Sequence, residues 1–379
     1  MLMGVLVGVL CTVAAVAAAL LFYRRMKQQN ILAAARKAVE QGGISSVEEV
    51  VLGGVRQRVL IQTRRPATPV LLVLHGGPGM PVPGVGCREA DWVFNLCTRR
   101  LLEQYTVVFW DQRGTGASWS RDIDPHSMHV EQHVEDAAQL VEWLTARFGT
   151  EKLTLCGISW GSLLGLKLAA RCPQKLDAYF GLAQIVDWTG SDKEAYTWLL
   201  QEAKMHGHNK ALRELERMGP PPYTLDLANW NQLRKWLMLL GGFIYNGGET
   251  KHPGMAAAFR LLLSSPDYSL GNLIRMFTRG MKLSYSPQTL RDMDAFNASI
   301  EIPRLEIPAT FIHGRLDRVI SGRLLEQYVD RLDSPQGKSL HWLERSAHMF
   351  CPDDARLVEE LLLAGVNPTW SANTKNMAY

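Results

Sequence analysis

Short apolar runs alternate with longer amphipathic stretches over most of this chain. The runs with the length and composition of strands lie at 47–52, 55–63, 70–74, 105–110, 153–156, 176–186, 309–313 and 339–343. The stretches with helical length and spacing lie at 91–103, 130–148, 163–170, 321–332 and 350–363. Because strands that alternate with helices form parallel sheets covered on both faces, the pattern predicts an α/β fold with a mostly parallel, eight-stranded sheet.

The alternation of strands and helices is interrupted between residues 187 and 299. The segment is helical in pattern, contains several tryptophans and is broken by Gly219-Pro-Pro-Pro-Tyr223 and Gly241-Gly242, with no good parallel strand. We therefore expect a helical lid at 187–299, inserted into an α/β core that is formed by 45–186 and 300–365.

The first residues form a separate unit. No charged side chain occurs between Leu2 and Tyr23, a length that can cross a bilayer as a helix, and Arg24, Arg25 and Lys27 follow directly. We interpret 1–23 as a transmembrane anchor and 24–44 as a juxtamembrane linker. Since positive flanks stay inside, the catalytic domain is expected in the cytoplasm. An uncleaved export signal is the alternative. The polar tail, 366–379, is expected to be loosely ordered.

Composition narrows the class of protein. The 379 residues are 47% hydrophobic, which is enough for a large buried core and excludes a disordered chain. The net charge is +4, but the basic residues are scattered or cluster near the apolar N-terminal segment, so we expect a lipid surface and not a nucleic acid as their partner. The six cysteines show no CxxC pair and no regular spacing, which predicts reduced thiols in a reducing compartment.

The most informative motif is Gly157-Ile-Ser-Trp-Gly161, which ends an apolar strand and opens a helix. This is the pattern of a nucleophile elbow, in which a sharp turn exposes the hydroxyl of Ser159 and leaves no space for a Cβ at either glycine. The N–H of Trp160 would lie at the helix N-terminus, where unpaired donors can hold a developing oxyanion. Ser159 is therefore the candidate nucleophile.

A second motif, His75-Gly-Gly-Pro-Gly79, follows the buried strand at 70–74. Composition alone suggests a structural turn. Its position after a buried strand instead indicates the loop that supplies the second oxyanion donor, which we assign to the N–H of Gly77.

Two further side chains complete the candidate site. Asp317 follows the strand at 309–313, and His348 lies in the loop after the last strand. The chain order Ser159, Asp317, His348 is the order that this fold class requires, with each residue at the carboxyl end of a strand. The sequence therefore predicts a Ser-His-Asp triad that needs no metal or cofactor.

Other polar residues are interpreted as structural. Asp111 and Arg113 could pair and stiffen the wall of the site. His126, His129 and His133 have a spacing that suggests a metal site, but no cluster of acids or cysteines accompanies them, so we expect solvated side chains at the start of the helix at 130–148.

Together, His75-Gly-Gly-Pro-Gly79, Asp111-Gln-Arg-Gly114 and Gly157-Ile-Ser-Trp-Gly161 resemble the signature of the proline iminopeptidase family of α/β-hydrolases. These serine enzymes remove an N-terminal residue, often proline, from peptides. The resemblance covers about 45–365 and implies Ser159 as nucleophile, His348 as general base, Asp317 as its orienting acid, and Gly77 and Trp160 as oxyanion donors. In the family, lid carboxylates bind the substrate's amino group. The candidates for substrate binding here are Glu194, Glu202 and Gln184.

Three functions remain open at this point. A peptidase acting on short peptides is favoured by the motifs, and a membrane-anchored carboxylesterase or amidase acting on small or lipid-derived acyl groups is favoured by the anchor and the tryptophan-rich lid. A non-catalytic membrane-tethered protein is disfavoured by the intact triad. The first two differ physically, because a substrate ammonium in a closed pocket needs buried carboxylate partners.

Overall fold

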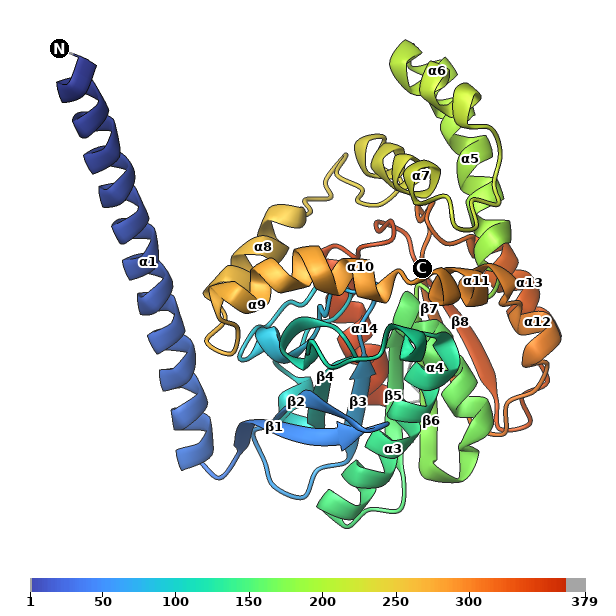
Figure 1. Cartoon of the computed structure of the whole chain (residues 1–379). Helices are drawn as coiled ribbons and strands as arrows, with labels where there is room; N and C mark the ends of the chain where they lie inside the picture. Colours follow the sequence, from blue (N-terminus) through green and yellow to red (C-terminus); the bar gives the residue numbers. More distant parts are fainter. Residues whose placement is uncertain (1, 366–379) are drawn as a thin grey trace.

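The computed structural model of the chain describes residues 2–365 (Figure 1). It contains one eight-stranded sheet in the order β1-β2-β4-β3-β5-β6-β7-β8. The strands are β1 (Ile44–Leu52), β2 (Val55–Thr63), β3 (Val70–Leu74), β4 (Thr106–Asp111), β5 (Leu153–Ile158), β6 (Leu176–Leu182), β7 (Ala309–Gly314) and β8 (Lys338–Leu343). β2 pairs antiparallel with β1 on one side and with β4 on the other, and all the other neighbouring strands pair parallel. The predicted α/β-hydrolase fold with its mostly parallel sheet is confirmed.

Helices cover both faces of the sheet, and each face has its own hydrophobic cluster. One cluster packs α3 (Val130–Phe148), α4 (Trp160–Arg171) and α13 (Gly322–Arg331) against the sheet. The other packs α2 (Leu101–Gln104) and α14 (Pro352–Ala364). The central strands β3, β4 and β5 are buried along their whole length, as expected for parallel strands between two helical layers.

The segment between β6 and β7 forms the lid, and the structure describes only helices and loops in it (Figure 1). Its helices are α5 (Trp188–Met205), α6 (Asn209–Met218), α7 (Leu227–Leu239), α8 (Met255–Ser264), α9 (Leu270–Arg275), a π-helical turn (Met276–Gly280), α10 (Met281–Ser284), α11 (Pro287–Ala295) and α12 (Ala298–Glu301).

Two predicted elements are corrected. The helix expected at 91–103 is reduced to α2, because the residues before it form a compact loop in which Phe94 takes a φ of 69° and Trp92 bridges to Cys97. Val93, Phe94 and Leu96 of this loop are buried, so burial rather than a helical face explains the pattern. The strand expected at 176–186 ends at Leu182, because Ala183 takes a φ of 47° and turns the chain.

The N-terminal residues form a single helix, α1 (Leu2–Glu40), which runs through the predicted anchor and most of the predicted linker. Its second half belongs to the folded body: Gln28, Ala35 and Ala38 are buried. Its first half stands clear of the body, with the best 18-residue window at a mean hydropathy of 2.7 and no buried part (Figure 1). By length and composition, α1 can cross a membrane. The predicted tail, 366–379, lies outside the described residues.

Candidate active site

Ser159 lies in a strained turn between β5 and α4. Its φ of 51° and ψ of −118° are unusual for a residue with a side chain, and they project the hydroxyl away from the strand. A Cβ on Gly157 would collide with the backbone of Gly161 and Ser162, and a Cβ on Gly161 would collide with the carbonyl oxygens at the end of β3. Both glycines are thus required by close backbone approach, as the elbow motif predicts.

The structure brings Ser159, His348 and Asp317 into one hydrogen-bonded chain. The Nε2 atom of His348 lies 3.0 Å from the Oγ atom of Ser159, and its Nδ1 atom lies 2.8 Å from Oδ2 of Asp317. The first distance is within the range for proton transfer from a nucleophile to its base, and the second is that of a hydrogen bond that orients the imidazole. The three residues follow β5, β8 and β7, so the carboxyl edge of the sheet assembles them.

Asp317 is held in its ionised form by its own loop. Its second oxygen, Oδ1, accepts hydrogen bonds from the backbone N–H groups of Val319 (2.7 Å) and Ile320 (3.0 Å). Burial raises the pKa of Asp317, but the charge and hydrogen bond of His348, together with the nearby ring of His313 and the N–H of Ile320, outweigh burial and keep the pKa below its ordinary value. The carboxylate can therefore orient and stabilise an imidazolium.

The glycine loop after β3 lies beside the nucleophile. A Cβ on Gly76 would be only 3.4 Å from the Cβ of Ser159 and 3.9 Å from its Oγ, so this loop starts next to the hydroxyl. Gly77 follows with a φ of +128°, which a residue with a side chain rarely adopts. Trp160 is the first residue of α4, where N–H groups have no partner within the helix.

Sequence reasoning missed the residue that ties the two oxyanion elements together, Gln112. Its Oε1 accepts from the indole N–H of Trp160 (2.8 Å), and its amide group donates to the carbonyl of His75 (3.2 Å). Burial lowers the pKa of His75 to about 4, so the ring is neutral, and its Nε2 accepts from the N–H of Gln112. The Asp111-Gln-Arg-Gly114 motif contained this residue, but only the fold shows its partners.

Asp111 and Arg113 do not pair with each other. Arg113 binds the buried carboxylate of Asp136 through two hydrogen bonds, of 2.7 and 2.8 Å, with both side chains almost fully buried. Asp111 accepts from backbone N–H groups and from the hydroxyl of Tyr268 in the lid, at 2.7 Å to Oδ2. Burial raises the pKa of Asp111 to about 7.

Of the three spaced histidines, His133 is not solvated. It is buried on α3, where its ring packs edge-on against the indole of Trp160, with 5.6 Å between ring centroids. His129 caps the N-terminus of α3 by accepting from the N–H of Gln132, and His126 is exposed. His133 therefore belongs to the buried face of α3 and packs against the first residue of the elbow helix.

Two of the three candidate substrate-binding residues lie away from the site. Gln184 is fully buried, where its amide donates to the carbonyls of Ser162 and Ile185, so it braces the elbow helix instead of facing a substrate. Glu202 pairs with His206 on α5. Ser191, near the start of α5, marks the end of the helix that is close to the site, because its hydroxyl oxygen accepts from the N–H of Ser321 in the loop after Asp317. At a rise of about 1.5 Å per residue, Glu202 lies roughly 16 Å further along the helix.

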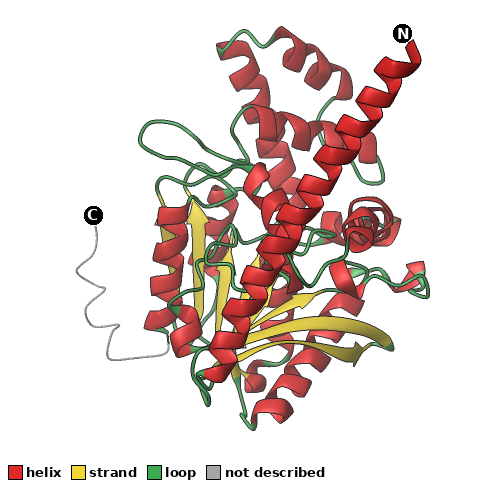
Figure 2. Ribbon diagram, turned by 90° about the vertical axis from the view of Figure 1, so that its left-hand side faces the viewer, coloured by secondary structure: helices red, strands yellow, loops and turns green. Residues whose placement is uncertain are grey.

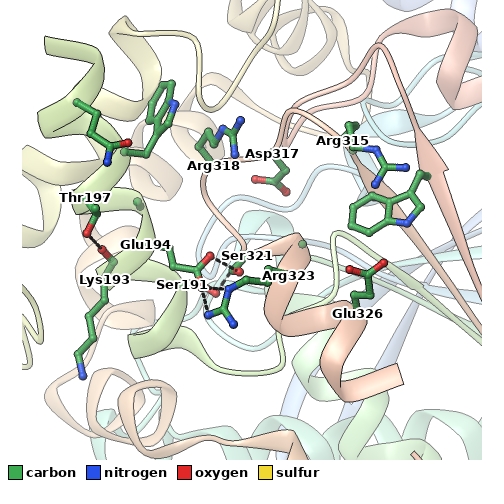
Figure 3. Close-up of a pocket in the computed structure, with 16 residues that line it drawn as sticks. Ser191, Lys193, Glu194, Thr197, Arg315, Asp317, Arg318, Ser321, Arg323 and Glu326 are labelled. Atoms are coloured by element: carbon green, nitrogen blue, oxygen red, sulfur yellow. Dashed lines mark hydrogen bonds and ion pairs between the residues drawn. The ribbon is translucent and has the colours of Figure 1, made fainter. Parts of the chain in front are cut away.

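The third candidate, Glu194, lines a cavity of about 580 Å³ that also reaches Asp317 (Figure 3). Its carboxylate is already occupied: one oxygen accepts from the hydroxyl of Ser321 at 2.6 Å, and the other pairs with the guanidinium of Arg323. Glu194 thus joins α5 to α13, and a substrate ammonium would have to displace Arg323.

The buried carboxylate of the lid, Asp192, is also paired. It accepts from Arg234 at 2.6 Å, and this guanidinium lies beside the stacked rings of Trp188 and Trp230, 4.8 and 4.7 Å from their centroids. Burial raises the pKa of Asp192, while the charge of Arg234 opposes that rise. A cation from the protein therefore fills the position next to this carboxylate.

Comparison with known proteins agrees with the fold. Residues 69–207 match the family model described as alpha/beta hydrolase fold. A probable aminopeptidase of Bacillus subtilis is 31% identical over 311 residues, which cover 82% of this chain and 92% of that protein. A probable proline iminopeptidase of Streptomyces coelicolor is 37% identical over 106 residues, or 27% of this chain and 28% of the relative.

Solved structures share the fold at low identity. A proline iminopeptidase-related protein from Thermus thermophilus superposes with a TM-score of 0.55 at 19% identity, over 86% of this chain and 99% of that one. A membrane phospholipase A described as a bacterial virulence factor superposes with a TM-score of 0.57 at 18% identity, over 96% of this chain and 98% of that one. At such identities the likeness concerns the fold alone.

Proposed function

Because the chain belongs to the proline iminopeptidase-like α/β-hydrolases and is a hydrolase, we propose that it cleaves ester or amide bonds as a serine hydrolase through an acyl-enzyme. The observation that carries this proposal is the hydrogen-bonded chain from Ser159 through His348 to Asp317. Nucleophile, base and orienting acid stand in the order and at the separations that acyl transfer needs.

The mechanism follows from these positions. His348 takes the proton of the Ser159 hydroxyl as its oxygen attacks the substrate carbonyl, and Asp317 stabilises the imidazolium that forms. The N–H groups of Gly77 and Trp160 would hold the tetrahedral oxyanion, each worth on the order of 3 kcal/mol in the transition state. His348 then protonates the leaving group, and water, deprotonated by the same imidazole, releases the acyl group from Ser159.

For the substrate, the lid favours acyl groups that carry no ammonium. Asp192 and Glu194 are each neutralised by an arginine of the protein, so neither is free to receive a second cation. An ammonium buried beside either of these carboxylates would have to displace its arginine, and a buried charge left unpaired is costly. Esters or amides of neutral acyl groups meet no such cost.

A second candidate is removal of the N-terminal residue, often proline, from short peptides. The names of the relatives favour it, above all the Bacillus subtilis protein that matches over most of both chains. For this reaction one of the lid ion pairs would have to open and release its carboxylate to the substrate ammonium.

We further propose that α1 anchors the enzyme in a membrane as a single span, with the catalytic domain on the cytoplasmic side. The apolar, exposed first half of α1 supports the anchor. Arg24, Arg25 and Lys27 support the orientation, because positive flanks favour the cytoplasmic side.

One experiment tests the chemistry and separates the two substrates. The purified full chain in detergent is assayed side by side on short-chain arylesters and on proline arylamide, with fluorophosphonate labelling of Ser159 as the measure of active protein. Turnover of esters well above arylamide supports the first candidate, and the reverse supports the second. If the variant Ser159→Ala keeps full activity, the serine mechanism is wrong.

A further inference from the structure

Outside α1, exposed large apolar side chains gather on the lid. Those on the lid helices and their loops are Met205, Leu225, Leu227, Met238, Leu239, Phe259, Leu263, Leu270, Ile274 and Phe277. One more, Ile300, lies on the last lid helix, α12, and Val51 and Leu357 are scattered over the rest of the described chain. An apolar surface of this extent is unusual in a protein that meets only water, and such surfaces mark sites of contact with a protein or a membrane.

Five of the lid residues form one surface, which we call the α8–α9 patch: Phe259, Leu263, Leu270, Ile274 and Phe277. The first two are four residues apart on α8, and the other three are spaced by four and three on α9 and the π-helical turn, so each set forms one helical stripe. The rings of Phe259 and Phe277 are in contact, with 5.4 Å between centroids, and join the two stripes.

The patch lies beside the end of the apolar half of α1, because α8 is in contact with α1 there. Figure 2 shows α1 as the long helix that crosses in front of the body towards the N-terminus. Arg24, the first charged residue after the apolar run, donates to the carbonyls of Leu263 (2.9 Å) and Tyr268 (2.6 Å), and Gln28 donates to the carbonyl of Ser265 (2.7 Å). These two side chains satisfy carbonyls at and after the C-terminus of α8, where a positive charge is also favourable. The position of the patch relative to α1 is thereby fixed.

A cavity of about 400 Å³ lies between α1 and α8 at the same level. Lys27 and Arg260 line it, together with the aromatic rings of Tyr23, Trp92 and Phe94, and the residues that line it include no carboxylate. Cations beside aromatic rings are the combination found at the boundary between lipid headgroups and acyl chains.

We propose that the α8–α9 patch rests on the lipid interface of the membrane that α1 spans, with anionic headgroups next to Lys27 and Arg260. The proposal rests on the membrane anchor proposed above. An apolar surface that α1 already holds at the bilayer loses little further translational entropy when it binds the lipid. The occupant is a lipid surface, since α1 is apolar and exposed up to Tyr23 and the patch begins where that stretch ends.

Docking would place membrane-derived acyl substrates near the triad. The helix that carries Ile274 and Phe277 continues through its π-helical turn into α10. There, Met281 and Ser284 pack against the glycine loop: a Cβ on Gly79 would lie 2.9 Å from Sδ of Met281 and 3.2 Å from Cβ of Ser284. One continuous helical segment thus connects the proposed lipid surface to the loop of the oxyanion donor.

The test uses the full chain in nanodiscs that contain phosphatidylcholine and phosphatidylserine. Cys11→Ala and Cys172→Ala first remove the two cysteines that are not buried. Single cysteines are then introduced in separate variants and labelled with an environment-sensitive fluorophore. The variants are Ile274→Cys in the patch, Ile300→Cys as the control and Val13→Cys in the apolar half of α1. Ile274 and Ile300 are both strongly exposed, at 66% and 78%, which makes them a matched pair. We expect iodide to quench the label at 274 several-fold less than the label at 300, and headgroup spin-labelled lipid to quench only the label at 274.

Other outcomes overturn the proposal. If iodide reaches the labels at 274 and 300 equally while the label at 13 is protected, docking is wrong and the anchor stands. If iodide also reaches the label at 13, the anchor and docking fail together. Protection at 274 that requires two chains in a disc indicates a second copy instead of lipid. Fluorophosphonate labelling of Ser159 in the same discs reports the proposed chemistry independently of all these outcomes.

Discussion

The carboxyl edge of the sheet and the lid above it use acidic side chains in different ways. At the edge, Asp317 is held by backbone N–H groups of its own loop, which leaves its other oxygen for His348. In the lid, Asp192 binds an arginine of another lid helix, α7, and Glu194 binds an arginine of α13 in the core. The comparison shows that a carboxylate oriented by its own loop is available for chemistry, whereas one that connects two helices is already neutralised.

The largest expected effect is at the edge. Asp317→Asn keeps the size of the side chain but removes the charge that stabilises the imidazolium and fixes its tautomer, so kcat should fall by roughly 10⁴-fold. Steady-state kinetics on the better of the two substrates measures the change, and circular dichroism checks that the fold is intact. Activity within a few-fold of the parent chain would remove Asp317 from the triad.

The buried ion pair below the site should dominate stability. Asp136 accepts from Arg113 and also from Gln57 and Gln132, with no exposed surface. Asp136→Asn leaves the guanidinium buried without its partner charge, so we expect the free energy of unfolding to fall by about 3–5 kcal/mol. Denaturant titration of the detergent-solubilised chain measures the loss.

The matched control is the exposed pair between Glu48 and Arg147, 2.9 Å apart. Glu48→Gln should cost between about 0 and 1 kcal/mol, because water screens an exposed pair. Equal losses in the two variants would contradict the distinction between buried and exposed pairs in this fold.

The stabilisation from the hydrogen bond between Tyr268 of the lid and Asp111 at the edge of the sheet should depend on pH. The hydroxyl of Tyr268 donates to Asp111, whose pKa burial raises to about 7. Between about pH 4 and 7 the carboxyl of Asp111 is protonated in the folded chain but ionised in the unfolded chain. The free energy of unfolding of the parent chain therefore falls as the pH rises through this range. The Tyr268 hydroxyl opposes this loss by stabilising the ionised form. Tyr268→Phe should therefore destabilise by about 1.5–3 kcal/mol at pH 8 and by less at pH 5.5, measured by denaturant titration.

Tyr328→Phe is the control for this pH dependence. The hydroxyl of Tyr328 is also buried, but it donates to the carbonyl of Ile302 (2.9 Å), which does not titrate. Its loss should cost about 1 kcal/mol at both pH values. The same pH dependence in both variants would show that Asp111 is not the titrating group.

The edge of the sheet was predictable from the sequence, because its chemistry is encoded in short contiguous motifs. Gly157 to Gly161 specify the turn around Ser159, and the position of Asp317 and His348 after successive strands specifies their meeting point. The parallel strands were also found, since each is a short apolar run between turn residues. Local pattern and chain order are sufficient for these features.

The remaining contacts could not be predicted because they join residues far apart in the chain. Tyr268 and Asp111 are 157 positions apart, and Arg24 and Tyr268 are 244 apart. No local period marks such pairs, and an acid on a helix has the same pattern whether it faces a substrate or an arginine. The structural role of Gln184 and the paired state of Glu194 are therefore findings of the fold.

The smallest expected effect is in the lid. Glu194→Gln removes a half-exposed charge whose partner, Arg323, remains largely in water, so stability should fall by less than about 1 kcal/mol. If the carboxylate only joins α5 to α13, KM should stay unchanged on both arylester and proline arylamide. Glu326→Gln, at another residue that lines the same cavity, is the control. A rise in KM confined to the arylamide and to Glu194→Gln would instead identify this carboxylate as the ammonium ligand, because only the peptide substrate carries that charge, and would place peptide cleavage ahead of ester cleavage.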